Sequence, residues 1–215
     1  MLTWEDKRYW LTADEIARNA FDQLFYQISS RGTNVFTDIC PLQMNYVNDV
    51  CSDTMMTVDF SHTIVTDKNN FHDLYDPDNM GLCLATDDYC EIEIITFLPK
   101  YYRVKKLISE PSFRQDFLNV IRHEIEHMFQ DGAYKLDEID LLTYDRSDIN
   151  FLLDPAEVPA YVHGFRISTR SLDNFKFTIK DFIEAHGKSL CLSKKEIKYT
   201  YEVWLKFLNN LGYAW

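Results

Sequence analysis

The segment His123-Glu124-Ile125-Glu126-His127 constrains this chain most, because it places two histidines four residues apart in a run with helical periodicity. Residues four apart lie on one face of a helix about one turn apart, so both imidazoles can reach one metal ion, at the roughly 2.0–2.1 Å of zinc–nitrogen bonds. Glu124 falls about 100° around the helix from His123. There a carboxylate can take a proton from zinc-bound water. The alternative interpretation is a solvated surface of two histidines and two glutamates.

The sequence around this motif predicts one continuous helix. Ser112 and Gln115 can form a capping box with Pro111 at the helix entry, and Ser109 is an alternative cap. Gly132 suits a left-handed terminator after the last turn. The apolar residues that recur at helical spacing are Phe113, Phe117, Val120, Ile121, Ile125, Met128 and Phe129. We therefore expect a mostly buried helix whose two histidines face a cleft.

Composition places the chain among folded globular proteins. Its 215 residues are 46% hydrophobic and 15% aromatic, enough for one sizeable domain. No apolar run approaches the roughly 18 residues of a membrane span, and no basic region followed by an apolar core marks a secretory signal. The five cysteines form no C-x-x-C pair and are odd in number, which favours buried thiols in a reducing compartment over a disulfide framework. We expect a cytoplasmic protein with no membrane partner.

The net charge of −12 is distributed unevenly. Residues 1–165 carry 13 basic and 29 acidic side chains, whereas residues 166–215 carry nine basic and five acidic ones. An acidic body argues against binding nucleic acid through its phosphates and tolerates basic substrates better than acidic ones. The simpler explanation is that the acidity maintains solubility.

Upstream of the motif, the pattern predicts one packing helix and a small sheet. Residues 12–30 have an apolar stripe at helical spacing, with Thr12 and Glu15 as a capping box. Residues 54–65 alternate in the manner of a strand, and residues 81–98 predict a hairpin. Between these elements, residues 33–53 and 67–80 are expected to be irregular. His62 is then expected to be a buried histidine, and His72 a solvated one.

The hairpin makes a specific prediction about register. If Asp87-Asp88 is the turn, Cys83 lies opposite Ile92 rather than Cys90, which excludes a disulfide between the two cysteines. The second strand, residues 91–98, ends shortly before the motif helix. It is either a sheet edge beside the metal, to which an extended substrate can add as a further strand, or an ordinary internal strand.

Downstream of the motif, residues 131–157 hold eight acidic and two basic side chains without clear periodicity, so they could form a loop or a lid. Asp131 could accept a hydrogen bond from a ligand imidazole or be a solvated helix end. Asp154 and Pro155 suit the start of a second helix with Glu157 in its first turn. Glu157 could cap that helix in a box with Asp154.

The helical HEIEH followed about thirty residues later by Asp154-Pro-Ala-Glu157-Val-Pro-Ala-Tyr161 resembles the gluzincins, zinc metallopeptidases whose third ligand is a glutamate on a later helix. It is most similar to small HExxH proteins of phages and other viruses. The resemblance covers residues 91–166. It implies one zinc ion per chain.

The resemblance also assigns roles to residues. It implies His123, His127 and Glu157 as zinc ligands, with Glu124 as the catalytic base. Tyr161 would orient a ligand or donate a hydrogen bond to the oxyanion. Pro159 departs from the family pattern, because it removes a donor near the helix start. His163 lies six residues past Glu157 and points elsewhere on an ideal helix, which makes it a weak rival as ligand.

The rest of the chain is predicted to be helical support. Ser193 and Glu196 cap a helix that runs to about Leu211, and residues 178–186 form a shorter one. We expect a single α+β domain of zincin type over residues 1–215, with a small, mostly antiparallel sheet, an active-site helix that carries HExxH and additional packing helices. Within it, residues 91–166 hold the catalytic core motifs and residues 167–215 are the C-terminal helical part.

The function expected from these features is hydrolysis of a peptide or protein substrate by a zinc metallopeptidase. Two alternatives come from other classes. One is a protein that binds zinc and a partner without turnover. The other is an acidic interaction protein, such as a nucleic-acid mimic, in which the HExxH sequence is accidental.

Overall fold

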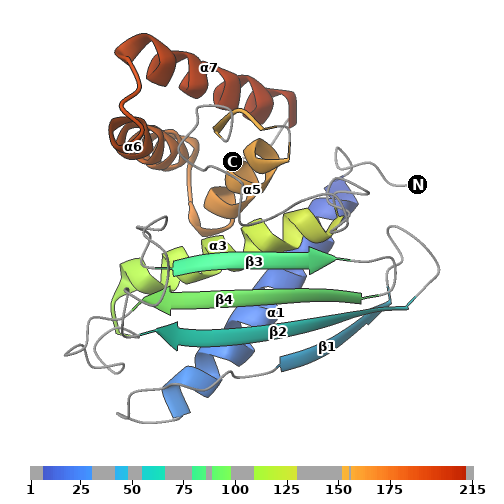
Figure 1. Ribbon diagram of the computed structural model, residues 1–215. Helices are drawn as coiled ribbons and strands as arrows, with labels where there is room; N and C mark the ends of the chain where they lie inside the picture. The colour runs from blue at the N-terminus through green and yellow to red at the C-terminus, as the bar shows by residue number, and fades with distance from the viewer. Residues whose placement is uncertain are drawn as a thin grey trace.

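The computed structural model describes residues 7–30, 42–47, 55–65, 79–85, 89–97, 109–129, 152–154 and 156–211 (Figure 1). Its helices are α1 (Lys7–Ser30), α3 (Pro111–Phe129), α5 (Glu157–Ser168), α6 (Leu172–Ser189) and α7 (Lys194–Leu211). Its strands are β1 (Leu42–Val47), β2 (Met55–Val65), β3 (Asn79–Ala85) and β4 (Tyr89–Phe97). Among the described residues, no helix has both the length and the apolar character needed to cross a membrane.

The four strands form one mixed sheet in the order β1-β2-β4-β3. The two outer pairs are antiparallel, and the central pair, β2 with β4, is parallel. The predicted hairpin is confirmed as β3 and β4, with Cys83 opposite Ile92. β4 is internal and the edge strands are β1 and β3, so the possibility that residues 91–98 form an edge is wrong.

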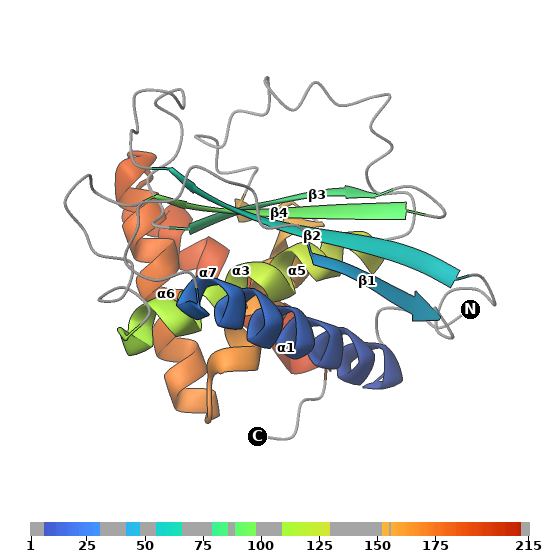
Figure 2. The same ribbon diagram turned by 90° about the horizontal axis from the view of Figure 1, so that it is seen from below.

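α1 and α3 cover one face of the sheet (Figure 2). The core between these two layers combines aromatic residues of the helices with aliphatic residues of β4. Phe117 of α3 is fully buried, and its ring centroid lies 6.0 Å from that of Phe21 in α1. Phe60 of β2 and Ile92 and Ile94 of β4 are also fully buried. This core fixes the orientation of α3 and therefore the direction in which its histidines point.

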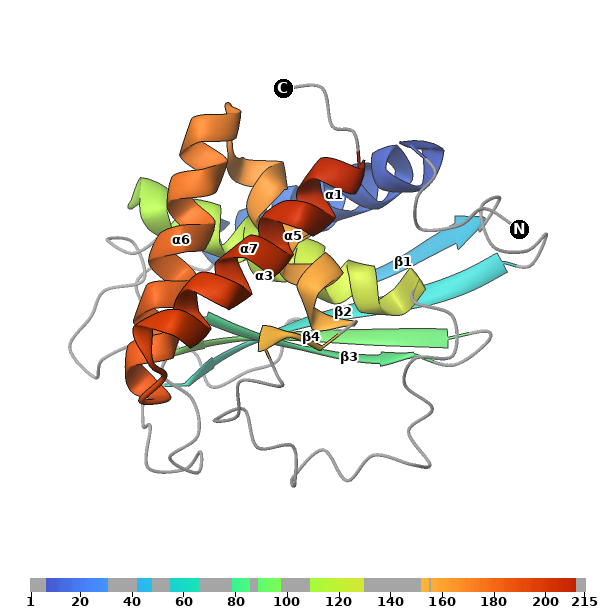
Figure 3. The ribbon, with the colours of Figure 1, turned by 90° about the horizontal axis from the view of Figure 1, so that it is seen from above.

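The last three helices lie beyond the β3 edge of the sheet and form a second hydrophobic cluster (Figures 1 and 3). Trp204 of α7 is fully buried there, and its indole N–H donates to the Leu152 carbonyl at 2.7 Å. The predicted capping box of α7 is confirmed: the Ser193 N–H donates to Glu196 Oε2 at 2.7 Å, and the Glu196 N–H donates to Ser193 Oγ at 3.3 Å. α5 joins both clusters, because its Ile167 packs in the first and its Val158 in the second.

The predicted fold class, a zincin-like α+β domain with a small, mostly antiparallel sheet, is wrong for this chain. Helices dominate the described residues: the shortest helix has 12 residues and the longest 24, whereas the strands have 6 to 11. The centre of the sheet is a parallel pair, which a succession of hairpins cannot produce. β2 reaches β4 across a connection that includes β3, and such non-local pairing is not encoded in a local alternation pattern.

Several element boundaries also differ from the prediction. α1 begins at Lys7, so Thr12 lies inside the helix rather than at its cap. α3 begins at Pro111, the favoured first position for proline, so Ser112 also lies inside its helix. β1 occupies part of the segment expected to be irregular. α6 is longer at both ends than predicted, and Ser171 caps it by accepting a hydrogen bond from the Asn174 N–H.

Candidate metal centre

Three predicted ligands meet at the point where α5 approaches α3. His123 and His127 lie one turn apart on α3, and their Nε2 atoms are 3.1 Å apart. The carboxylate of Glu157, the first residue of α5, has Oε2 at 3.3 Å from His123 Nε2 and Oε1 at 3.7 Å from His127 Nε2. The three side chains form a group whose candidate ligand atoms all lie within 4.8 Å of one another.

These separations fit a zinc site. Ligand atoms bound to one tetrahedral zinc ion at about 2.0–2.1 Å lie roughly 3.3 Å from each other. The observed distances of 3.1, 3.3 and 3.7 Å lie around that value. Two neutral imidazoles and one carboxylate are the donor types that zinc accepts, and three protein ligands leave a fourth position open. The three side chains are 12–13% exposed, so the group is recessed but reachable from solvent.

The start of α5 explains why Glu157 can face the histidines. Ala156 is the N-cap residue and makes no side-chain cap hydrogen bond, so the predicted cap by Asp154 is wrong. Asp154 instead stabilises the turn just before the helix: its Oδ1 accepts from the Ala156 N–H at 2.8 Å, and its carbonyl accepts from the Val158 N–H at 3.0 Å. The carboxylate of Glu157 lies against His123 and His127 instead of forming the alternative box with Asp154. Pro159 does not disturb the helix, because a first-turn residue has no intrahelical partner for its N–H.

Tyr161 lies one turn after Glu157 and packs against the ring of His123. The two ring centroids are 4.4 Å apart at an interplanar angle of 65°. The Tyr161 ring also stacks on the ring of Trp204, with centroids 5.5 Å apart. This arrangement fits the role of orienting a ligand imidazole. The alternative role, a hydrogen bond to an oxyanion, stays a prediction.

Glu124 lies beside the three-residue group and is not part of it. Its Oε1 is 3.8 Å from His123 Nε2, and the residue is 6% exposed. Gly81 of the edge strand β3 packs directly on this side chain: a Cβ built on Gly81 would lie 2.3 Å from Glu124 Oε1. Sequence reasoning missed Gly81. The available signal was weak: a glycine at the first residue of the predicted hairpin, and a glycine in a strand can mark a close approach.

A second glycine sets the distance between α3 and α5. A Cβ on Gly164 would lie 2.8 Å from the carbonyl oxygen of Asn119 and 3.4 Å from His123 Cβ. With its amide turned to match its neighbours, Asn119 donates to the Gly164 carbonyl at 2.9 Å and to Ser168 Oγ at 2.6 Å. The helices can therefore approach closely enough for Glu157 on one to meet two histidines on the other.

We expect Gly164→Ala to weaken zinc binding, because the added methyl group pushes α5 and its Glu157 away from α3. Overpacking of this kind costs about 1–3 kcal/mol of unfolding free energy. Gly187→Ala is the matched control, since its Cβ would lie 2.6 Å from Ile197 Cγ1 within the C-terminal cluster. Titration with a competing chelator should give a lower zinc affinity for Gly164→Ala only. Equal affinities in the two variants would contradict the proposed spacing role.

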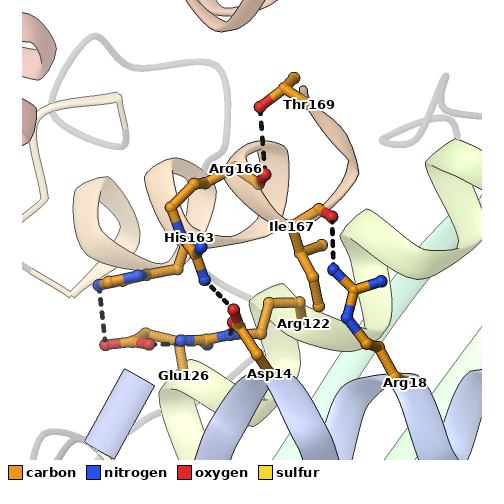
Figure 4. Close-up of polar contacts among 8 residues, drawn as sticks. All are labelled: Asp14, Arg18, Arg122, Glu126, His163, Arg166, Ile167 and Thr169. Carbon is orange, nitrogen blue, oxygen red and sulfur yellow. Dashed lines mark hydrogen bonds and ion pairs between the residues drawn. The ribbon is translucent and has the colours of Figure 1, made fainter. Parts of the chain in front are cut away.

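Behind the histidines, a network of charged side chains joins α1, α3 and α5 (Figure 4). Arg122 is fully buried and donates to Asp14 Oδ1 at 2.9 Å and to Glu126 Oε2 at 2.8 Å. Arg166 of α5 pairs with the other oxygen of Asp14. Two arginines and two carboxylates balance in charge, which buried ions require. The network holds the helix that bears Glu157 against the helix that bears the histidines.

His163 belongs to this network rather than to the metal group. It is fully buried, and its Nε2 lies 3.9 Å from Glu126 Oε1. Burial lowers the pKa of His163 from 6.5 to about 3; Glu126 opposes this shift and Arg122 adds to it. As expected from its spacing, His163 lies apart from the group formed by His123, His127 and Glu157.

The buried His163 predicts a loss of stability in acid. The unfolded chain binds a proton at this residue below about pH 6.5, whereas the folded chain stays neutral there down to about pH 3. The stabilisation is complete above pH 6.5 and is lost as the pH falls, with a limiting slope of about 1.4 kcal/mol per pH unit. Urea unfolding of chelator-treated protein at several pH values should reveal this slope. In His163→Leu the slope should be smaller by about 1.4 kcal/mol per pH unit, which corresponds to one proton. An unchanged slope would contradict the assignment to His163.

Some candidate residues cannot be placed. Asp131, Pro155 and His72 lie outside the described residues, as does the acidic segment 131–151. The backbone of His62 is part of β2, but its side chain is not described. Cys191 is a free cysteine but an exposed one, so the expectation of a buried thiol is wrong for this residue.

Comparisons with known proteins identify no relative of this chain. No family model, no curated protein and no solved structure matches it. The function of the chain is therefore inferred from the geometry of the site and from the resemblance of its motifs.

Proposed function

We propose that this protein is a zinc-dependent hydrolase that cleaves peptide bonds. The observation that carries the proposal is the convergence of His123, His127 and Glu157 at ligand distances, with Glu124 directly beside them. Each of these residues was selected from the sequence for that role, and the helices bring them together from positions up to 34 residues apart in the chain. Accidental HExxH sequences have no reason to be completed by a third ligand on another helix.

The chemistry follows from where each side chain lies. His123, His127 and Glu157 would hold a zinc ion, which would supply Lewis-acid chemistry for amide hydrolysis. Glu124 would accept a proton from the attacking water and deliver it to the leaving amine. Its carboxylate is 3.8 Å from His123 Nε2, beside the three grouped side chains and outside their set. Tyr161 keeps the imidazole of His123 in orientation by packing on its ring.

The position of β3 favours an extended peptide as the substrate. β3 is the edge of the sheet and packs on the helix that carries the motif. A peptide can add to an exposed edge through main-chain hydrogen bonds, which bind it independently of most side chains. Gly81 brings this edge next to Glu124, so a peptide bound there would pass beside the proposed base.

The first test is metal content. Freshly purified protein that has not met a chelator should hold close to one zinc ion per chain in elemental analysis, and should take up zinc again after its removal. Cleavage of a broad peptide library should stop with chelator and return with zinc. Absence of any transition metal, with no rebinding, would favour the accidental-motif alternative. Normal zinc content without any cleavage would favour the binding protein.

A further inference from the structure

One contact at the site involves a residue that is neither a candidate ligand nor an acid–base group. The Cα of Gly81 in β3 lies against the side chain of Glu124 so closely that a Cβ would be 2.3 Å from Oε1, 2.4 Å from Cγ and 2.6 Å from Cδ. Real Cβ atoms essentially never approach other heavy atoms within 3.0 Å. Most of the Glu124 side chain therefore occupies the space that any other residue at position 81 would fill.

The surroundings leave few ways to relieve such a clash. Glu124 is 6% exposed, and its neighbours on α3, Ile121 and Ile125, are fully buried in the first hydrophobic cluster. Gly81 pairs with Ile94 of β4, which is also fully buried. Neither the helix nor the strand can retreat without disturbing that core. The carboxylate of Glu124 is the part that must move.

We propose that Gly81 is a positioning residue. Because it has no side chain, the Glu124 side chain can occupy the space next to it, and this placement sets the Glu124 carboxylate beside the two histidines. The catalytic meaning of this placement rests on the proposed hydrolase function. The contact itself does not, because it involves only two residues of this chain. The two can therefore fail separately.

A double-mutant cycle tests the contact. The proteins are the parent, Gly81→Ala, Glu124→Ala and the double variant, each studied by thermal unfolding after chelator treatment. Gly81→Ala should lower the unfolding midpoint of the parent by roughly 4 °C or more, as expected for overpacking in a chain of this size. In the Glu124→Ala background the same change should cost less than half as much, because the clashing side chain is gone.

Gly187→Ala is the matched control for this cycle. Its Cβ would also clash, at 2.6 Å from Ile197 Cγ1, but on α6 and away from Glu124. It should lower the midpoint equally in both backgrounds. An equal loss for Gly81→Ala in the two backgrounds would overturn the proposal, whether or not the protein hydrolyses peptides.

Kinetics then separate positioning from general stability. In a parent that cleaves peptides, Gly81→Ala should keep its zinc and lower kcat about tenfold or more, with little change in KM. That split is expected if only the acid–base group is displaced. An unchanged kcat would overturn the proposed positioning role. A parent that binds no zinc would refute the proposed function alone, and the unfolding cycle would still decide the contact.

Discussion

Glu124→Gln is expected to abolish most of the peptide hydrolysis while the protein keeps its zinc and its fold. Glutamine has the size and reach of glutamate, so it fits the same space over Gly81. It cannot accept a proton at neutral pH, and loss of a general base lowers rates by about 10²- to 10⁴-fold. Zinc occupancy should equal that of the parent, since Glu124 is not one of the three grouped ligands.

The measurement combines elemental analysis with chelator-sensitive cleavage of a peptide library. Glu184→Gln is a suitable control, because it makes the same chemical change at a 42% exposed position on α6. The control should cleave at the parent rate. Undiminished cleavage by Glu124→Gln would show that another residue is the base, and parallel loss of zinc would show that Glu124 helps to hold the metal.

The parts of the site that depend on a single helix could be predicted from the sequence. His123 and His127 meet because four residues make about one turn, which is a local property. The hairpin register, with Cys83 opposite Ile92, and the capping box of Ser193 and Glu196 are local as well. Local spacing is enough for each of these features, so the structure reproduces them.

The parts that depend on contacts between elements could not be predicted in the same way. The parallel pairing of β2 with β4 and the clustering of α5, α6 and α7 arise from non-local packing. The space left by Gly81 and Gly164 has no periodic signature, because a glycine reveals its neighbour only when the neighbour is in place. The charge network around Arg122 was missed for the same reason: its members come from three helices.

Glu157 combines the two cases. Its candidacy came from a motif resemblance, and no local rule specifies how closely α5 approaches α3. In the structure, its carboxylate lies 3.3 and 3.7 Å from the two imidazoles, whereas His163 is buried on another side of the same helix. The tertiary packing thus separates two residues that sequence spacing alone left as rivals.

Glu157→Gln is accordingly expected to lower zinc affinity by more than about 100-fold. That figure is the upper end for loss of residues that only support a ligand, and a ligand itself should matter more. The amide is neutral, so the site loses its single anionic donor and a two-histidine site remains. His127→Ala should cause a loss at least as large, since it removes one of the two imidazoles that define the site.

The affinity is measured by zinc competition with a chromogenic chelator, and circular dichroism confirms that each variant is folded. Asp137→Asn and Asp140→Asn, which remove acids of the segment between the two helices, serve as controls and should bind zinc as the parent does. Full affinity in Glu157→Gln, with a loss in either aspartate variant, would place the third ligand in that segment. The approach of α5 to α3 would then be a feature of helix packing alone, without a role in metal binding.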